Sequence, residues 1–335
     1  MRTVFKRGFI VLFSALFLIT ACSDDDDQNN TTTDPGPESL TATLAADARF
    51  TILVDALQRT GLDATLDASG TYTVFAPTNT AFAAALDELG LDDLDALETA
   101  LGMDGLRNVL LYHVLGAKVM AADVSTGYVS TLASNGDGDA LSAYIEVAGM
   151  VKLNGVSEVE ETDIMASNGV AHVIKAVILP MSITDLIAVN SNYSSLVTAL
   201  TVADGSLDSV LAVGGDFTVF APDNGAFDDV VAATPGVTNL NELVAALGTD
   251  GLATVLLYHV TNGVILAGDL PNLSSNTVST LAVDAGGTSL TWDLNLGTEV
   301  SITDGSMATD DAIVTEVDIV ATNGAIHFID AVLLP

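Results

Sequence analysis

The residues best suited to chemistry in this chain are its four histidines, which occupy matching places in two repeated patterns. His113 and His259 each follow a tyrosine at the end of an apolar run, and His172 and His327 each follow the pattern Asp-Ile-x-Ala-x-Asn-Gly. Imidazoles can bind zinc or transfer protons near neutral pH. A zinc site needs three or four ligands close together, and neither HExxH nor another clustered pattern supplies them. We therefore expect no metal and no cofactor, and we interpret these histidines as buried, hydrogen-bonded core residues.

A second set of side chains has the spacing of calcium ligands. Asn135, Asp137, Asp139 and Glu146 fall at positions 1, 3, 5 and 12 of an EF-hand-like loop. The position that needs glycine is Ala140, and the matching segment of the second repeat lacks the acids. The pattern therefore predicts a turn between two strands rather than a calcium site.

Sequence patterns typical of enzymes are missing. The chain has no Gly-x-Ser-x-Gly nucleophile motif and no phosphate-binding Gly-Lys-Ser/Thr loop, and its single cysteine is Cys22. Carboxylates are abundant, but nothing in their spacing marks a glycosidase-type pair. We therefore predict that the protein is not an enzyme.

The elements that position these residues occur twice. Thr-Val-Phe-Ala-Pro is found at 73–77 and 218–222, Leu-Leu-Tyr-His-Val follows in each copy, and the Asp-Ile pattern comes last, with copies 145, 146 and 155 positions apart. A period of this length is the size of a whole domain rather than of a solenoid repeat. We therefore predict two tandem modules, residues 39–180 (the first module) and 181–335 (the second module).

Local patterns within each module predict helices early and strands late. Apolar residues at i, i+3, i+4 and i+7 predict an amphipathic helix at 50–57 and another at 193–200. A short β-rich run follows, and Thr78 and Asp223 come after its proline as helix N-caps. The last third of each module is β-rich, with glycine-containing turns. Segregated helices and strands favour an α+β fold over an alternating parallel sheet.

The N-terminus has the pattern of an export signal. Three basic residues precede a short apolar run, and Ile-Thr-Ala-Cys resembles the bacterial lipobox, which predicts a signal peptide at 1–21 and a lipidated Cys22. Residues 22–38 contain four consecutive aspartates, Asp24 to Asp27, close to their start and predict an acidic, disordered tether. The aspartates resemble a surface-export signal, so we expect an outer membrane lipoprotein displayed on the cell surface. An ordinary signal peptide and a merely solvating charge run are the alternatives.

The charge balance excludes whole classes of partner. The formal net charge is -35, and removal of residues 1–21 leaves 44 acidic residues against 6 basic ones. From 181 to 335 there are 19 Asp and Glu and no Lys or Arg. Phosphate backbones and anionic lipid headgroups both attract cations, so we expect no nucleic acid, and contact with the membrane only through the lipid anchor.

The ordered motifs carry a family resemblance. The series Thr-Val-Phe-Ala-Pro-x-Asn-x-Ala-Phe, Leu-x-Tyr-His-Val, Asp-Ile-x-Ala-x-Asn-Gly-x-x-His and Val-x-Leu-Pro resembles the fasciclin (FAS1) domain, in residues 39–180 and again in 181–335. The resemblance implies a wedge of two β-sheets flanked by helices in each module. It also implies extracellular adhesion or matrix binding, because family members act mainly by binding proteins, glycans or cell surfaces.

The resemblance also suggests binding residues. In animal members the Tyr-His region and the Asp-Ile motifs are linked to integrin binding. The matching residues here are Tyr112, His113, Asp163, Ile164, Tyr258, His259, Asp318 and Ile319. The segment 161–165 comes closest to the animal pattern, with Thr where that pattern has Pro. The expectation of a binding surface transfers to this chain, and the integrin ligand does not.

These observations together predict a non-enzymatic, surface-anchored adhesion or matrix-binding lipoprotein that contacts an extracellular protein or polysaccharide. The alternative is a glycan-binding or envelope-scaffolding lipoprotein that faces the periplasm. Exposed aromatic residues in a groove would favour the alternative, and Trp292 is the only tryptophan. We expect His113 and His259 to be buried. We expect Asp163 and Asp318 to be exposed, so that their replacement alters binding more than stability.

Overall fold

The computed structural model describes residues 38–68, 70–203, 211, 215–270, 275–297, 299–305 and 311–335. The predicted signal peptide, Cys22 and nearly all of the predicted tether lie outside the described residues. Residues 37–335 form one compact unit that contains both modules.

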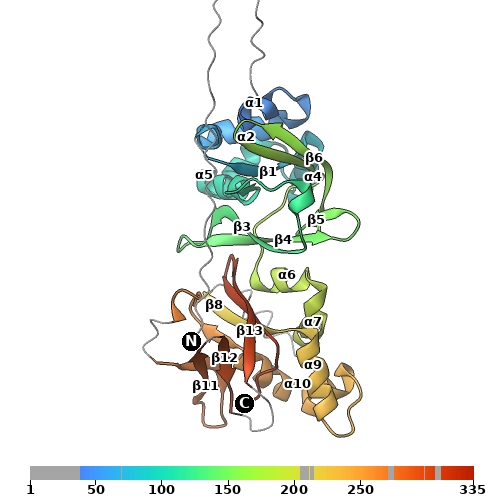
Figure 1. The fold of residues 1–335 in the computed structure, drawn as a ribbon, viewed down its shortest axis with the longest axis vertical. Helices are drawn as coiled ribbons and strands as arrows, with labels where there is room; N and C mark the ends of the chain where they lie inside the picture. The colour runs from blue at the N-terminus through green and yellow to red at the C-terminus, as the bar shows by residue number, and fades with distance from the viewer. Residues whose placement is uncertain are drawn as a thin grey trace, which may run out of the picture. The chain divides into compact units, whose positions relative to one another are not determined.

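The first module begins with helices and ends with strands (Figure 1). Its elements are α1 (Leu40–Ala45), η1 (Ala48–Phe50), α2 (Thr51–Thr60), α3 (Leu62–Asp67), β1 (Tyr72–Pro77), α4 (Asn79–Leu89), α5 (Leu94–Tyr112), β2 (Val114–Leu115), η2 (Ala121–Asp123), β3 (Gly127–Ser134), β4 (Ala140–Val147), β5 (Val151–Leu153), β6 (Ser157–Ala166) and β7 (Gly169–Ile174).

The second module repeats this order. Its elements are α6 (Ile183–Ala188), η3 (Ser191–Tyr193), α7 (Ser194–Val202), β8 (Phe217–Pro222), α9 (Asn224–Ala233), α10 (Leu240–Tyr258), β9 (Val260–Asn262), β10 (Thr277–Val283), β11 (Ser289–Leu296), β12 (Val300–Thr303), β13 (Ala312–Ala321) and β14 (Gly324–Ile329). The predicted α+β class, with helices before strands, is therefore confirmed in both modules.

The described strands of each module form one seven-stranded sheet, in which each strand is hydrogen-bonded to its neighbours. The order is β2-β1-β7-β6-β5-β4-β3 in the first module and β9-β8-β14-β13-β12-β11-β10 in the second. Among the described strands, the β1–β7 and β8–β14 pairs are the parallel ones. The long strands β6 and β13 pair with a different set of strands on each side and carry register shifts along their length. A bulged strand bends, so each module has two sheet halves that share one bent strand, as the expected wedge requires.

The predicted helix starts are confirmed by their caps. The Thr78 hydroxyl accepts a hydrogen bond from the Ala81 backbone N–H at 3.2 Å, at the start of α4. The Asp223 carboxylate accepts from the Ala226 N–H at 2.8 Å, at the start of α9. Each cap satisfies a backbone donor that the first helical turn leaves free.

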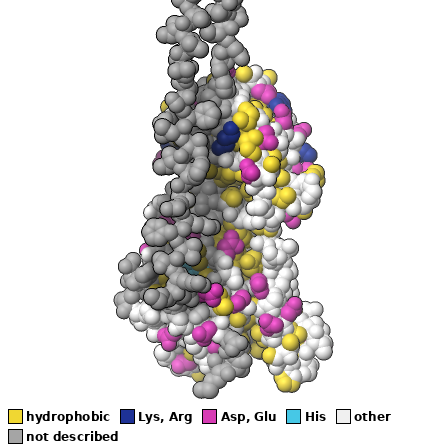
Figure 2. All heavy atoms as spheres, viewed as in Figure 1, with side chains coloured by type: hydrophobic (Ala, Val, Ile, Leu, Met, Phe, Trp, Pro, Cys, Tyr) yellow, Lys and Arg dark blue, Asp and Glu magenta, His cyan; other side chains and the backbone are white. Residues whose placement is uncertain are grey.

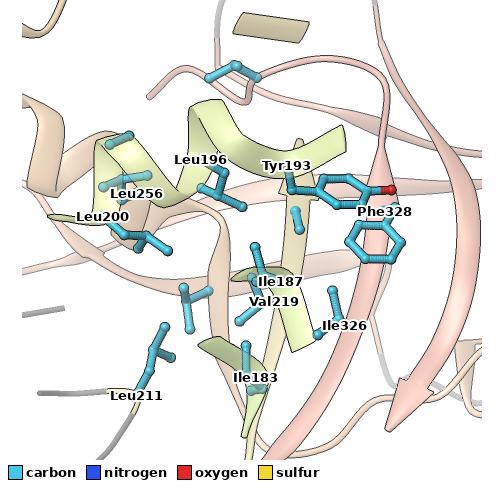
Figure 3. Packing of buried hydrophobic residues seen from close by; sticks show 14 of the residues in the cluster. Ile183, Ile187, Tyr193, Leu196, Leu200, Leu211, Val219, Leu256, Ile326 and Phe328 are labelled. Atoms are coloured by element: carbon cyan, nitrogen blue, oxygen red, sulfur yellow. The ribbon is translucent and has the colours of Figure 1, made fainter. Parts of the chain in front are cut away.

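A hydrophobic core fills the space between the helices and β8, β13 and β14 in the second module. The Tyr193 and Phe328 rings stack with centroids 3.9 Å apart, and leucine, isoleucine and valine side chains pack beside them (Figure 3). Trp292 lies in a separate cluster, where it is 2% exposed and meets Phe220 edge-on. Burial of this many apolar side chains in each module supplies the main driving force for folding.

Hydrogen bonds and a ring contact join the two modules. The Tyr128 hydroxyl on β3 donates to the Leu186 carbonyl at 2.8 Å, and its ring lies 5.5 Å from that of Phe328. The Val320 N–H on β13 donates to the Ser142 hydroxyl at 3.0 Å. Among the described residues, Tyr128 of the first module packs against the core of the second, and Val320 and Leu266 of the second module pack with a core cluster of the first.

Within the described part of the chain, α10 is the one helix with the length and hydropathy of a membrane span. Gly248, with φ of 69°, interrupts it, and Gly102 interrupts α5 at the matching place. The segment after Gly248 contributes Leu252, Val255 and Leu256 to the second core. We therefore interpret α10 as a core helix of its module.

We expect added salt to stabilise the second module. Its 19 acids have no Lys or Arg to offset them, and on the face in Figure 2 dark blue side chains lie only on the first module. Salt shortens the Debye length from about 30 Å at 0.01 M to about 8 Å at 0.15 M and so weakens the mutual repulsion. A gain of about 1 kcal/mol raises Tm by about 2–4 °C. Trp292 fluorescence reports this transition. An unchanged Tm, or a large rise with calcium only, would contradict the expectation.

Candidate functional site

The two Tyr-His dipeptides lie at the ends of the long helices α5 and α10. His113 is the C-cap of α5, and its Nδ1 lies 2.7 Å from the Val109 carbonyl, while the Ile178 N–H donates to its Nε2 at 3.1 Å. His259 repeats this geometry, with Nδ1 2.8 Å from the Val255 carbonyl and Nε2 accepting from the Leu333 N–H at 2.8 Å. Each imidazole therefore joins its helix to the last segment of its own module.

Burial keeps both imidazoles neutral. His113 is 2% exposed and His259 is 3% exposed. Desolvation lowers the pKa of each to about 4, and hydrogen bonding to the helix carbonyl opposes this only in part. The predicted burial of these two histidines is confirmed, and neither can act as a proton acceptor for a ligand while both of its ring nitrogens are occupied.

The tyrosines before them are core residues as well. The Tyr112 hydroxyl donates to the Ser142 carbonyl at 2.7 Å and accepts from the Asn154 side chain at 3.0 Å, and burial raises its pKa to about 12. The Tyr258 hydroxyl donates to the Thr291 carbonyl at 2.7 Å, and desolvation raises its pKa. Both side chains anchor a helix end to the opposite sheet half.

The two aspartates of the Asp-Ile motifs lie at bulges in β6 and β13. Asp163 and Asp318 both have φ of 61°, a left-handed conformation that few residues other than glycine, asparagine and aspartate adopt readily. The Asp163 carboxylate accepts from the Ala121 N–H at 2.9 Å, and the Asp318 carboxylate accepts from the Ala267 N–H at 2.7 Å. Each carboxylate therefore fixes a loop that follows the short strand β2 or β9.

The remaining two histidines, His172 and His327, contact the same aspartates and the same loops. His172 Nδ1 accepts from the Asp163 N–H at 3.2 Å, and its Nε2 lies 3.0 Å from the Val119 carbonyl. His327 Nδ1 accepts from the Asp318 N–H at 3.3 Å, and its Nε2 lies 2.8 Å from the carbonyl of Ile265. Burial lowers the pKa of His327. All four histidines thus have structural partners on both ring nitrogens.

Hydrogen bonding and close packing explain the Asn-Gly pair in the turn between the last two strands of each module. The Asn168 side chain accepts from the Leu40 N–H at 2.9 Å and donates to the Leu66 carbonyl, so it joins α1 and α3 to the turn. A Cβ at Gly169 would collide with the Tyr72 carbonyl on the parallel neighbour β1. Only glycine allows such close approach, so this motif secures the fold.

The structure thus places the residues suggested by the resemblance mainly in the interior. Tyr112, His113, Tyr258, His259 and Ile319 are buried, and Ile164 packs against the first core. Asp163 and Asp318 are partly buried and hydrogen-bonded, and not exposed as expected. The side chains displayed beside the motifs are their neighbours, which sequence reasoning passed over: Glu161, Thr162, Met165, Glu316 and Val317.

We expect Asp163→Ala and Asp318→Ala to destabilise their modules by about 1–3 kcal/mol, because each leaves a loop N–H without its acceptor and places alanine in a left-handed conformation. Asn keeps an acceptor and tolerates that conformation, so Asp163→Asn is the matched control and should cost less. Urea unfolding monitored by circular dichroism measures the effect. Unchanged stability with lost binding would instead make the aspartate a contact residue.

The loop with calcium-like spacing is a hairpin turn, as predicted. It connects the antiparallel strands β3 and β4. The Asn135 side-chain oxygen accepts from the N–H groups of Asp137 and Asp139 at 3.0 and 2.8 Å. Glu146 lies along β4, opposite Lys152 of β5. Among the described residues, no group of three or more His, Cys, Asp or Glu side chains is arranged to hold a metal ion.

Comparison with known proteins finds relatives in animals and in a cyanobacterium. The chain is 28% identical over 275 residues to the pig transforming growth factor-beta-induced protein ig-h3, covering 81% of this chain and 35% of that protein. It is 25% identical to human periostin, covering 87% of this chain and 30% of periostin. It is 39% identical to protein sll1483 of Synechocystis over 42% of this chain and 73% of that protein. The chain therefore spans about a third of the two animal proteins.

The chain is also similar to a solved structure and to a family model. A FAS1 domain pair from the insect cell adhesion molecule fasciclin I aligns with 88% of this chain and 96% of its own, at 17% identity and a TM-score of 0.47. The model of the fasciclin domain matches residues 48–180 and again residues 191–335. The chain therefore belongs to the fasciclin-domain family and consists, over these residues, of two tandem FAS1 modules.

Proposed function

We propose that this protein is a non-enzymatic adhesion or matrix-binding protein, held at the outer surface of the cell by lipid on Cys22. Fasciclin domains are associated with cell adhesion and matrix binding in homologues, and two of them make up residues 48–180 and 191–335. The export pattern at 1–21, with Cys22 at its end, supports secretion and anchoring.

The proposal that the protein is not an enzyme rests mainly on the burial and hydrogen bonding of the four histidines. All four are at most 3% exposed, and each has a partner on both ring nitrogens. Histidine is the commonest general base at neutral pH, and here every imidazole serves the fold. This supports a function exercised by surface contact.

The partner proposed is an extracellular protein or polysaccharide. The surface of the second module carries acids without bases, which disfavours anionic polymers there. The first module carries all six basic residues that remain after residues 1–21 are removed. Binding of the purified full-length chain to arrays of extracellular proteins and polysaccharides tests the proposal. Saturable binding to at least one of them is expected, and binding to none would contradict it.

We expect Cys22→Ala to move the protein from the membrane fraction to the soluble fraction. Two or more acyl chains make attachment stable, and the variant has no site for them. Sedimentation with membranes and incorporation of labelled fatty acid into the wild-type chain measure the effect. A variant that still sediments with membranes, beside a wild type that takes up no fatty acid, would contradict lipid anchoring.

Replacement of Asp24 to Asp27 with alanine separates surface display from the alternative of a scaffold facing the periplasm. The variant should keep its lipid and become less accessible to external protease, because the four aspartates are the proposed export signal. If external protease cleaves the variant on intact cells as readily as the wild type, the proposed export role of the aspartates is wrong. If the wild type is already protected from external protease, the periplasmic alternative is favoured.

A further inference from the structure

An open hollow of about 550 Å³ lies between the second half of α5 and the β3–β4 turn of the first module, and Thr322 of the second module also lines it. This volume falls in the range of small-ligand sites. Arg107 and Asp104 come from α5, Ser134 ends β3, and Leu111 and Leu141 supply the apolar part of the lining. The hollow therefore offers a cation, a carboxylate, a hydroxyl and an apolar area in one lining.

Arg107 is the feature that points to a ligand. Its Nη1 donates to the Thr60 carbonyl at the end of α2, at 2.7 Å. Among the described residues, ion pairs occupy Arg49, Arg59 and Lys175. Arg107, like Lys118 and Lys152, has no described carboxylate within ion-pair distance, and of these three it is the one that lines the hollow. A guanidinium has five N–H donors, so several remain for a partner. In a chain with 44 acidic residues, an arginine without an acidic partner is available for an anion from outside.

The walls of the hollow are held in place by their own hydrogen bonds. The Asn108 side chain donates to the Ser134 carbonyl at 2.9 Å and accepts from the Ser134 N–H at 3.0 Å. Asn135 is fixed across the turn by its bonds to Asp137 and Asp139. A rigid wall lowers the entropic cost of binding, because little must be ordered when a ligand arrives.

The ligand chemistry follows from the presence of both Arg107 and Asp104 in the lining, where they form no ion pair with each other. A ligand must present an acceptor to the guanidinium and donors to the carboxylate, both within one small hollow. A sugar acid does this, because its carboxylate can take two guanidinium N–H bonds while its hydroxyls donate to Asp104. Its C–H faces suit the apolar area at Leu111 and Leu141. An acidic peptide side chain brings the carboxylate without the hydroxyls.

We propose that this hollow binds a uronic acid unit of an extracellular polysaccharide. The proposal rests on the adhesion function proposed above and assigns its glycan contact to one place on the first module. The second module has Ala253 and Thr254 where the first has Arg107 and Asn108. It therefore lacks the cation, and one site per chain is expected.

Calorimetric titration of the purified full-length chain tests the site, with the trimer of galacturonic acid as the probe. The buffer contains 0.15 M salt, to screen the repulsion between two anions, and EDTA, to exclude calcium bridging. Saturable binding with one site per chain is expected. Arg107→Gln should weaken it about tenfold or more, and full methyl esterification of the trimer should do the same, because both remove the charge-assisted pair. Arg107→Lys should retain part of the affinity.

Arg49→Gln is the matched control, since it removes the same charge from an arginine already paired with Asp47 and Glu161. It should leave the affinity unchanged, and circular dichroism verifies that each variant is folded. Absence of binding, or equal binding by the methyl ester or by Arg107→Gln, overturns the proposal. Equal binding of a triglutamate peptide overturns the assignment to sugars. Binding to other polymers on the arrays without uronate binding would refute this site and leave the adhesion function standing.

Discussion

The His113→Ala variant should lose about 3 kcal/mol of unfolding free energy, a large share of the stability of one module. The change opens a cavity in a packed region and leaves both the Val109 carbonyl and the Ile178 N–H without partners. The helix α5 and the last segment of the first module then lose the residue that joins them. Urea unfolding monitored by circular dichroism measures the loss.

His259→Ala makes the same change in the second module. Trp292 lies in that module, so its fluorescence reports the unfolding of the second module. The indole N–H donates to the Tyr258 carbonyl at 3.1 Å, next to His259, and the chain has no other tryptophan. The fluorescence transition should therefore shift strongly in His259→Ala and much less in His113→Ala. Adhesion lost by either variant would then reflect unfolding. Variants that stay fully stable but no longer bind would make Tyr-His itself the contact site.

The parts of the fold that sequence predicted are those encoded by local patterns. The i, i+3, i+4, i+7 spacing after Phe50 and after Tyr193 marks α2 and α7, and Thr78 and Asp223 mark the helix starts that follow. Burial of His113 follows from its place after an apolar helical run. Such features depend on neighbours within a few residues, so a single sequence contains the information.

The part that could not be predicted depends on contacts between distant segments. Asp163 becomes structural because β6 bulges against β7 and because Ala121, 42 residues earlier in the chain, supplies the N–H for its carboxylate. Nothing in the letters Asp-Ile reveals a left-handed backbone. Likewise, only the folded structure shows that Arg49 has an acidic partner and Arg107 has none. The partner of Arg49 is Glu161, which lies 112 residues away in the chain. The candidate ligand site was therefore visible only in three dimensions.

Both modules should lose stability as the pH falls from 6.5 toward 4. The unfolded state binds protons on His113 and His259 at about pH 6.5, whereas the folded state resists until about pH 4 because the rings are desolvated. Protonation therefore favours unfolding between pH 6.5 and pH 4. The contribution of the neutral histidines to the free energy of unfolding is fully present above pH 6.5. At pH 5 the cost is about 2 kcal/mol for each histidine. The lowered pKa of His327 acts in the same direction in the second module.

The carboxylates oppose this trend, because their protonation relieves the repulsion of a chain with net charge -35. The ordinary pKa of a carboxyl group is about 4, and about 0.5 M salt screens the repulsion between carboxylates, so we expect the histidines to dominate between pH 6.5 and 5 under those conditions. Denaturant unfolding monitored by Trp292 fluorescence at intervals of pH should show the decline in the second module. His259→Gln does not titrate and should have a distinctly smaller slope than the wild type, even if it is less stable at every pH. A wild-type stability that is flat or rises from pH 6.5 to 5 in high salt would show that His259 accepts a proton in the folded state and is not the desolvated core residue described above.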